Sequence, residues 1–220
     1  MSYIGKIPTA APLTSSDVAD GIITNAKLAQ DIISADTALG AEPADTDEFL
    51  VSDAGTLKRM DYSYIKGGGK LLQVVQTVKT DTFTAGSTGS WIDITGLTVD
   101  ITPASSSNKV LVSFHIGAHS QTDANTHGIR ILRDSTTIGV GATASARISA
   151  AVWIYPGSGA NSSVPSSSEY LDSPSSTSAL TYKLQMYANT TAYINQMSTD
   201  SDNTVYGRTA SSITVKEISG

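Results

Sequence analysis

Apolar and polar residues alternate in short runs from Leu71 to Ile218, and this alternation constrains the fold more than any other feature of the chain. Successive side chains of a β-strand point to opposite faces of a sheet, so a period of two residues indicates strands with one buried face. In the last run, Ile213 and Val215 are expected to point inward. The clearest run is 109–116, whose expected buried residues are Val110, Val112, Phe114 and Ile116.

Nine or ten such runs, separated by turn residues, predict a mainly β domain with no helical period between positions 71 and 218. This spacing is typical of a β-sandwich or jelly roll. In the first run, Leu72, Val74 and Val78 share one face. The segment 156–168 is rich in Gly, Ser and Pro and is expected to be a loop at a tip of the sandwich. The expected strands are 71–79, 91–94, 97–101, 109–116, 129–133, 136–138, 147–155, 180–186, 191–196 and 211–218.

The chain before residue 70 differs in character. Residues 1–15 contain two prolines and little periodicity, which predicts an extended arm that buries too little surface to order itself. Around 53–55, two strand-like runs flank a turn in which Gly55 can supply a positive φ, so a hairpin is expected. Three glycines at 67–69 then predict a boundary. The predicted regions are an arm and neck over 1–44, a hairpin and linker over 45–69, and a β-sandwich head over 70–220.

A weak repeat lies within the first region. The segment 18–24 aligns with 28–34, and each copy contains a pair of isoleucines. Two copies are too few for a solenoid, which needs about three. One interpretation is a short amphipathic helix over 16–28 with Ser16 as its N-cap. The other is a segment that buries its isoleucines against copies of itself. The isoleucines concerned are Ile22, Ile23, Ile32 and Ile33.

Composition argues against several classes of function. The net charge is −6, and no cluster of Lys and Arg is present that could bind phosphates, so no nucleic-acid partner is expected. The chain has no cysteine, which rules out disulfides and mildly favours assembly in a reducing cytoplasm. No window approaches 18 apolar residues, so no membrane insertion is expected, and the first residues do not have the pattern of a signal peptide.

Two parts of the chain resemble a known family. The segments DGIITNAKLAQDII and DEFLVSDAGTLKRMDYSYIKG are similar to the N-terminal parts of bacteriophage tail fibres and other virion appendage proteins. The layout LLQVVQTVKT … GSWIDITGLTVDITPASSSNKVLVSF … SSITVKEI resembles the small jelly-roll heads of such fibres, which are similar in shape to the tumour-necrosis-factor fold.

This resemblance implies a homotrimer located in the virion and assembled in the cytoplasm of a bacterial host. The four isoleucines would then pack at a threefold axis in a trimeric neck. The arm would attach to other virion proteins, with Tyr3, Ile4, Ile7 and Leu13 as its anchors. The head would face the host.

No catalytic constellation can be named from the sequence. There is no G-x-S-x-G motif, and no nucleophile, base and orienting group can be identified together, so the protein is not expected to be an enzyme or to need a cofactor. Two carboxylate clusters, Glu169 with Asp172 and Asp200 with Asp202, are interpreted as loop charges. The segment 200–203 has oxygen ligands suited to calcium but lacks the pattern of an EF-hand loop.

Aromatic side chains in the second half of the chain remain as candidate contacts, because Tyr and Trp at loop tips stack on sugars and anchor interfaces. The alternative is ordinary packing within the sandwich. The candidates for receptor contact are Trp153, Tyr155, Tyr170 and Tyr206, with Tyr187 and Tyr193 nearby. Two functions follow: adhesion of a virion fibre to a host-surface glycan or protein, or a purely structural role in a head-decoration, neck or adaptor fibre.

Overall fold

The computed structural model describes residues 39–41, 43–65, 69–121, 125–155 and 162–220. Its contacts divide the chain into two compact units, Met1–Lys66 and Gly67–Gly220. The predicted helix over 16–28 and the predicted anchor and neck residues lie outside the described residues. The anchor and neck residues are Tyr3, Ile4, Ile7, Leu13, Ile22, Ile23, Ile32 and Ile33.

The first unit contains the predicted hairpin. Strands β1 (Glu48–Asp53) and β2 (Thr56–Asp61) pair antiparallel, and a 3-10 helix, η3 (Tyr62–Tyr64), follows them. The turn residues Ala54 and Gly55 have φ values of 50° and 85°, the left-handed conformation that a two-residue hairpin turn requires. Large apolar side chains stay open to solvent, with Leu50 74% exposed. None of the described residues of this unit belongs to a buried core, and an isolated hairpin of this kind is marginally stable in water.

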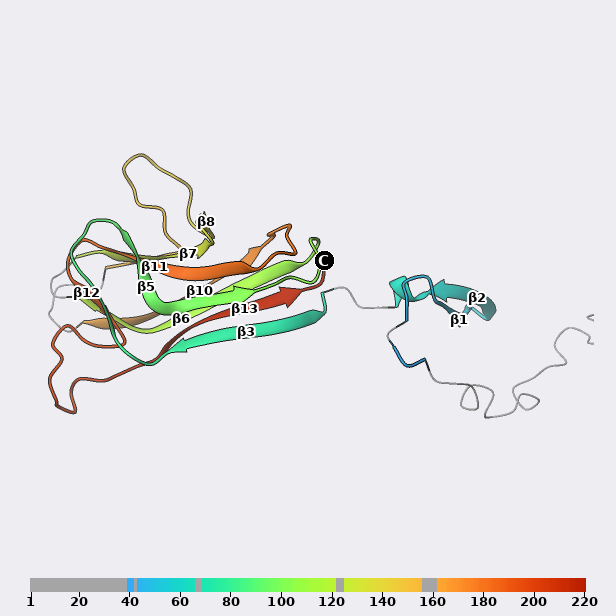
Figure 1. Ribbon diagram of the computed structural model, residues 1–220, viewed down its shortest axis with the longest axis horizontal. Coiled ribbons are helices and arrows are strands. Elements are labelled where there is room, and N and C mark those ends of the chain that lie inside the picture. Colours follow the sequence, from blue (N-terminus) through green and yellow to red (C-terminus); the bar gives the residue numbers. More distant parts are fainter. Residues whose placement is uncertain (1–38, 42, 66–68, 122–124, 156–161) are drawn as a thin grey trace, which may run out of the picture. The chain divides into compact units, whose positions relative to one another are not determined.

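The second unit is built from strands in two layers (Figure 1). One layer, the β6 sheet, has the order β3-β13-β6-β12-β4, with β10 paired to β6 along its other side. The other layer, the β11 sheet, has the order β5-β11-β7-β8, with β9 also paired to β7. All strand pairs are antiparallel, which agrees with the predicted β-sandwich. The strands are β3 (Leu71–Lys79), β4 (Phe83–Ala85), β5 (Trp91–Ile101), β6 (Lys109–Gln121), β7 (His127–Arg133), β8 (Thr136–Ile138), β9 (Val152–Ile154), β10 (Ser163–Asp172), β11 (Leu180–Ala188), β12 (Ala192–Ile194) and β13 (Ser211–Ile218).

The core lies between the two sheets and confirms the inward faces predicted for β6 and β13. In β6 the four predicted side chains are at most 4% exposed, and in β13 Ile213 and Val215 are fully buried. From the facing sheet, β11 contributes Tyr182, Leu184 and Met186. Burying a side chain of this size stabilises a fold by roughly 1.5–3 kcal/mol, so these positions dominate the stability of the head.

Strand β3 shows that alternation alone does not decide which face is inside. Leu72, Val74 and Val78 do share a face, and all three are exposed. The other face contains Gln73, Val75, Thr77 and Lys79, of which Lys79 is buried and pairs with Asp81. The aliphatic residues of β3 therefore lie on the outer surface of the β6 sheet.

The prediction of a loop over 156–168 is wrong for residues 163–168, which form the first part of β10. These residues pair with β6 from Ser163 opposite Ser120 onward. The pairing shifts register between Val164 and Ser166, where Pro165 interrupts the strand. Proline is tolerated at such irregularities and on edge strands, so a Ser- and Pro-rich sequence can still complete a sheet. Other differences are smaller: 91–101 is one strand, the run 147–155 forms a strand only over β9, and the short strand β4 was not predicted.

Candidate functional site

An aromatic row crosses the outer face of the β11 sheet. Tyr187 of β11 lies opposite Trp91 of β5 on one side and opposite Gly128 of β7 on the other. Gly128 in turn lies opposite Trp153 of β9. Because side chains alternate along a strand, and neighbours such as Ile129 point into the core, the row faces outward.

Gly128 makes room for the ring of Trp153 because it has no side chain. A Cβ atom at this position would come within 2.6 Å of the Trp153 ring, so the indole rests directly on the backbone of β7. The centroid of Tyr187 lies 5.8 Å from that of Trp153 and 5.6 Å from that of Trp91, with an edge-on arrangement in the second pair. Such aromatic pairs contribute about 0.5–1.5 kcal/mol beyond their buried area, and they hold Trp153 in a fixed orientation while it stays 42% exposed.

A ladder of polar side chains runs beside the aromatic row. The guanidinium of Arg130 lies 4.4 Å from the Trp91 ring centroid and donates two hydrogen bonds to Gln185 Oε1. Gln185 and Lys183 both donate to the carboxylate of Asp93. These two hydrogen bonds lower the pKa of Asp93, and burial lowers the pKa of Arg130. The polar groups of the ladder thus hydrogen-bond to one another, and Arg130 covers one face of Trp91. At the other end of the row, Trp153 remains accessible to solvent.

The four predicted receptor contacts do not form one site. Trp153 belongs to the aromatic row, and Tyr155, 62% exposed, follows β9 with the alternation that places it on the same face. Tyr170 lies in β10, in the other sheet, where its side chain is next to Gly139. Tyr206 lies in the loop between β12 and β13. Sequence reasoning missed Trp91 as a site residue, since it appeared there only as the start of a strand.

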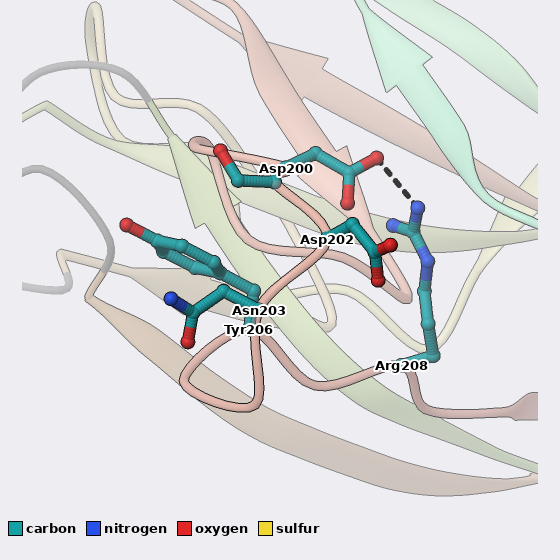
Figure 2. A pocket seen from close by; sticks show the side chains of 6 residues that line it. Asp200, Asp202, Asn203, Tyr206 and Arg208 are labelled. Carbon is teal, nitrogen blue, oxygen red and sulfur yellow. Dashed lines mark hydrogen bonds and ion pairs between the residues drawn. The ribbon is translucent and has the colours of Figure 1, made fainter.

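The loop of Tyr206 contains a polar pocket of about 280 Å³ (Figure 2). Asp200 pairs with Arg208, which also donates to Gln196. Figure 2 shows Asp200 and Asp202 on the side facing Arg208, while Tyr206 and Asn203 lie on the other side of the loop. Arg208 neutralises part of the acidic charge at this loop, and the described residues contain no cluster of three or more metal-ligating side chains.

The other carboxylate cluster does not converge. Glu169 is exposed on β10, whereas Asp172 is buried and accepts two hydrogen bonds from Arg133 and one from the hydroxyl of Tyr182. The pKa of Tyr182 is raised mainly by burial and further by the neighbouring Asp172 carboxylate. Arg133 and Tyr182 belong to the β11 sheet and Asp172 to β10, so this network links the two sheets and has a structural role.

Two histidines are buried together in the core of the head. His119 of β6 stacks on His127 of β7 with ring centroids 5.1 Å apart, and neither side chain is exposed. His119 Nε2 is hydrogen-bonded to the hydroxyl of Ser166. Burial lowers the pKa of His119 to about 3 and that of His127 to about 4. His115, by contrast, is exposed on the outer face of β6.

A scan against models of protein families finds none that matches this chain, and a search of curated proteins finds no match. Among the described residues, no helix has the length and apolar character needed to cross a membrane.

Proposed function

We propose that this protein is a fibre of a bacteriophage virion whose head contacts the host surface without catalysing a reaction. The observation that supports adhesion most directly is the aromatic row, in which Trp153 is held in a fixed orientation and left open to solvent. Rigid, partly exposed aromatic side chains provide contact area at low cost in conformational entropy, which suits recognition.

The proposal includes a homotrimer with a jelly-roll head. Successive strands β5, β6 and β7 alternate between the two sheets, as do β10, β11 and β12, which is the pattern expected of a jelly roll. The outer face of the β6 sheet carries exposed aliphatic side chains, with Val74 52% and Val78 54% exposed. Identical copies around a threefold axis would cover such a surface.

In the same proposal, the region before residue 66 attaches the fibre to other virion proteins. The support is the hairpin of β1 and β2, which exposes apolar side chains and has no core among its described residues. Residues 1–65 fused to an unrelated trimer should be incorporated into particles, and a chain that starts at Lys70 should not be. The opposite result would reverse the assignment of the two ends.

A glycan array probed with the full chain and with Trp153→Ala tests the adhesive function. Adhesion through the aromatic row predicts reproducible hits for the native protein and loss of these hits for Trp153→Ala, with melting temperatures unchanged to within a few degrees. An array without hits, obtained with folded native protein, would instead favour the alternative of a purely structural virion protein.

A further inference from the structure

We infer that the Trp153 end of the aromatic row binds a sugar that carries a carboxylate, as in an acidic polysaccharide. This inference rests on the proposed adhesive function and specifies its ligand. An open pocket of about 330 Å³ lies at this end, and it is lined by Ala146, Arg147, Ile148 and Trp153.

The pocket is formed by an excursion of the chain between β8 and β9, visible in Figure 1 as the long loop that projects from the end of the sheet near β8. A tight turn at its centre is closed by the Arg147 N–H, which donates to Ala144 O at 3.1 Å. Ser145 has a φ of 55° within this turn. The base of the excursion is fixed by a hydrogen bond from Ala151 N to Ile129 O, next to Trp153 in the sheet.

Arg147 is the only arginine of the chain whose guanidinium has no side-chain partner within the described residues. The others are all engaged: Arg59 with Glu48, Arg130 with Gln185, Arg133 with Asp172 and Arg208 with Asp200. The side chain of Arg147 is exposed at the edge of the pocket. A protein with a net charge of −6 thus presents a free guanidinium beside an exposed indole.

These two groups select a ligand by complementary chemistry. The exposed face of Trp153 offers a flat apolar surface for the C–H face of a pyranose ring, and Ile148 adds an apolar wall. The guanidinium of Arg147 matches a planar carboxylate in a bidentate arrangement, and charge-assisted hydrogen bonds of this kind are about twice as strong as neutral ones. A neutral sugar would leave the charge unused, and a small anion would leave the indole unused. A galacturonate unit fits both, since its axial hydroxyl leaves one ring face apolar.

The test is calorimetric titration of the full chain with hexagalacturonate and with its fully methyl-esterified form. The ester keeps the shape of the ligand and removes its charge, so we expect binding to weaken about tenfold or more. Arg147→Gln should weaken hexagalacturonate binding to a similar extent and abolish the preference over the ester. Arg147→Lys should retain part of this preference. Arg59→Gln, which removes the same charge from the hairpin, should change nothing.

Trp153→Ala should reduce binding of both ligands below detection, and Trp153→Phe should retain measurable binding if Ala at this position proves unstable. Equal affinity for acid and ester, or full affinity in Arg147→Gln, would overturn the inference. Hits confined to neutral glycans in the array would overturn it as well and leave the adhesive function in place. If no saccharide binds, the inference and adhesion to a host glycan both fail.

Discussion

The two outer faces of the sandwich differ in chemistry although they enclose the same core. The β6 sheet presents exposed aliphatic side chains, such as Val74 and Val78, among polar ones such as Gln76, Thr214 and Lys216. The β11 sheet presents Trp91, Tyr187 and Trp153 with a ladder of charged and amide groups. The exposed aliphatic side chains of the first face suit close contact with an identical surface. On the second face, the polar side chains beside Trp91 hydrogen-bond to one another, whereas the Trp153 end is open to solvent. That open end suits a ligand.

The largest effect should come from a substitution that places a charge in the core between the two sheets. Val112 of β6 is fully buried, and an unpaired carboxylate there costs several kcal/mol, a large part of the stability of a domain. We expect Val112→Asp, like Phe114→Asp, to prevent folding of the head, as measured by circular dichroism and solubility. Ser113→Asp places the same charge one residue away on the outer face and should leave the head folded. A folded Val112→Asp protein with native melting would mean that the inward face is misassigned.

The next effect concerns the β6 face alone. Val78→Asp places a charge on the exposed aliphatic surface of β3, so a trimer that buries this surface should dissociate while the sandwich keeps its fold. Light scattering measures the mass, and near-UV circular dichroism reports the packing. Thr98→Asp adds the same charge to the exposed outer face of β5 and should leave the mass unchanged. A native protein that is monomeric at micromolar concentration would refute the trimer itself.

Acid should weaken the link between the two sheets at the stacked histidines. Because the folded-state pKa values of His119 and His127 are depressed to about 3 and 4, the unfolded chain takes up protons between pH 6.5 and 4 that the folded chain does not. Stability is therefore fully present above pH 6.5 and falls as the pH is lowered, by up to about 2 kcal/mol per histidine between pH 6.5 and 5. Urea unfolding at these two pH values checks the slope. His119→Gln should reduce it.

Much of the fold was predictable because the inward faces of most strands are simple alternations of large apolar residues. The alternation in 109–116 identified the interior of β6 correctly. It could not orient β3, whose outward residues are more apolar than Gln73 and Thr77 on its inner side. Strand β10 was hidden for the opposite reason, since its serines carry no hydrophobic signal and its position depends on backbone pairing with β6. Both exceptions lie at the sides of the β6 sheet, where burial is incomplete.

The candidate site was predictable only in part because its members come from four strands far apart in the sequence. Trp153 was identified from its residue type and its position near a loop. Its relation to Trp91 and Tyr187 depends on the register of β5, β11 and β7, which no local pattern reveals. The role of Gly128 depends on the approach of a ring from β9. Tyr170 and Tyr206 had the same sequence features and proved to lie elsewhere.

The smallest predicted effect separates the two ends of the aromatic row. Arg130→Lys removes the two-pronged contact with Gln185 and weakens the cation–π contact with Trp91, so the free energy of unfolding should fall by about 1 kcal/mol. Binding of hexagalacturonate should not change, because the Trp91 end is occupied by the protein's own ladder and the ligand pocket lies at Trp153. Urea titration measures the first quantity and calorimetry the second. A loss of binding in Arg130→Lys without a loss of stability would extend the ligand site along the whole row and make both ends of the β11 face part of one binding surface.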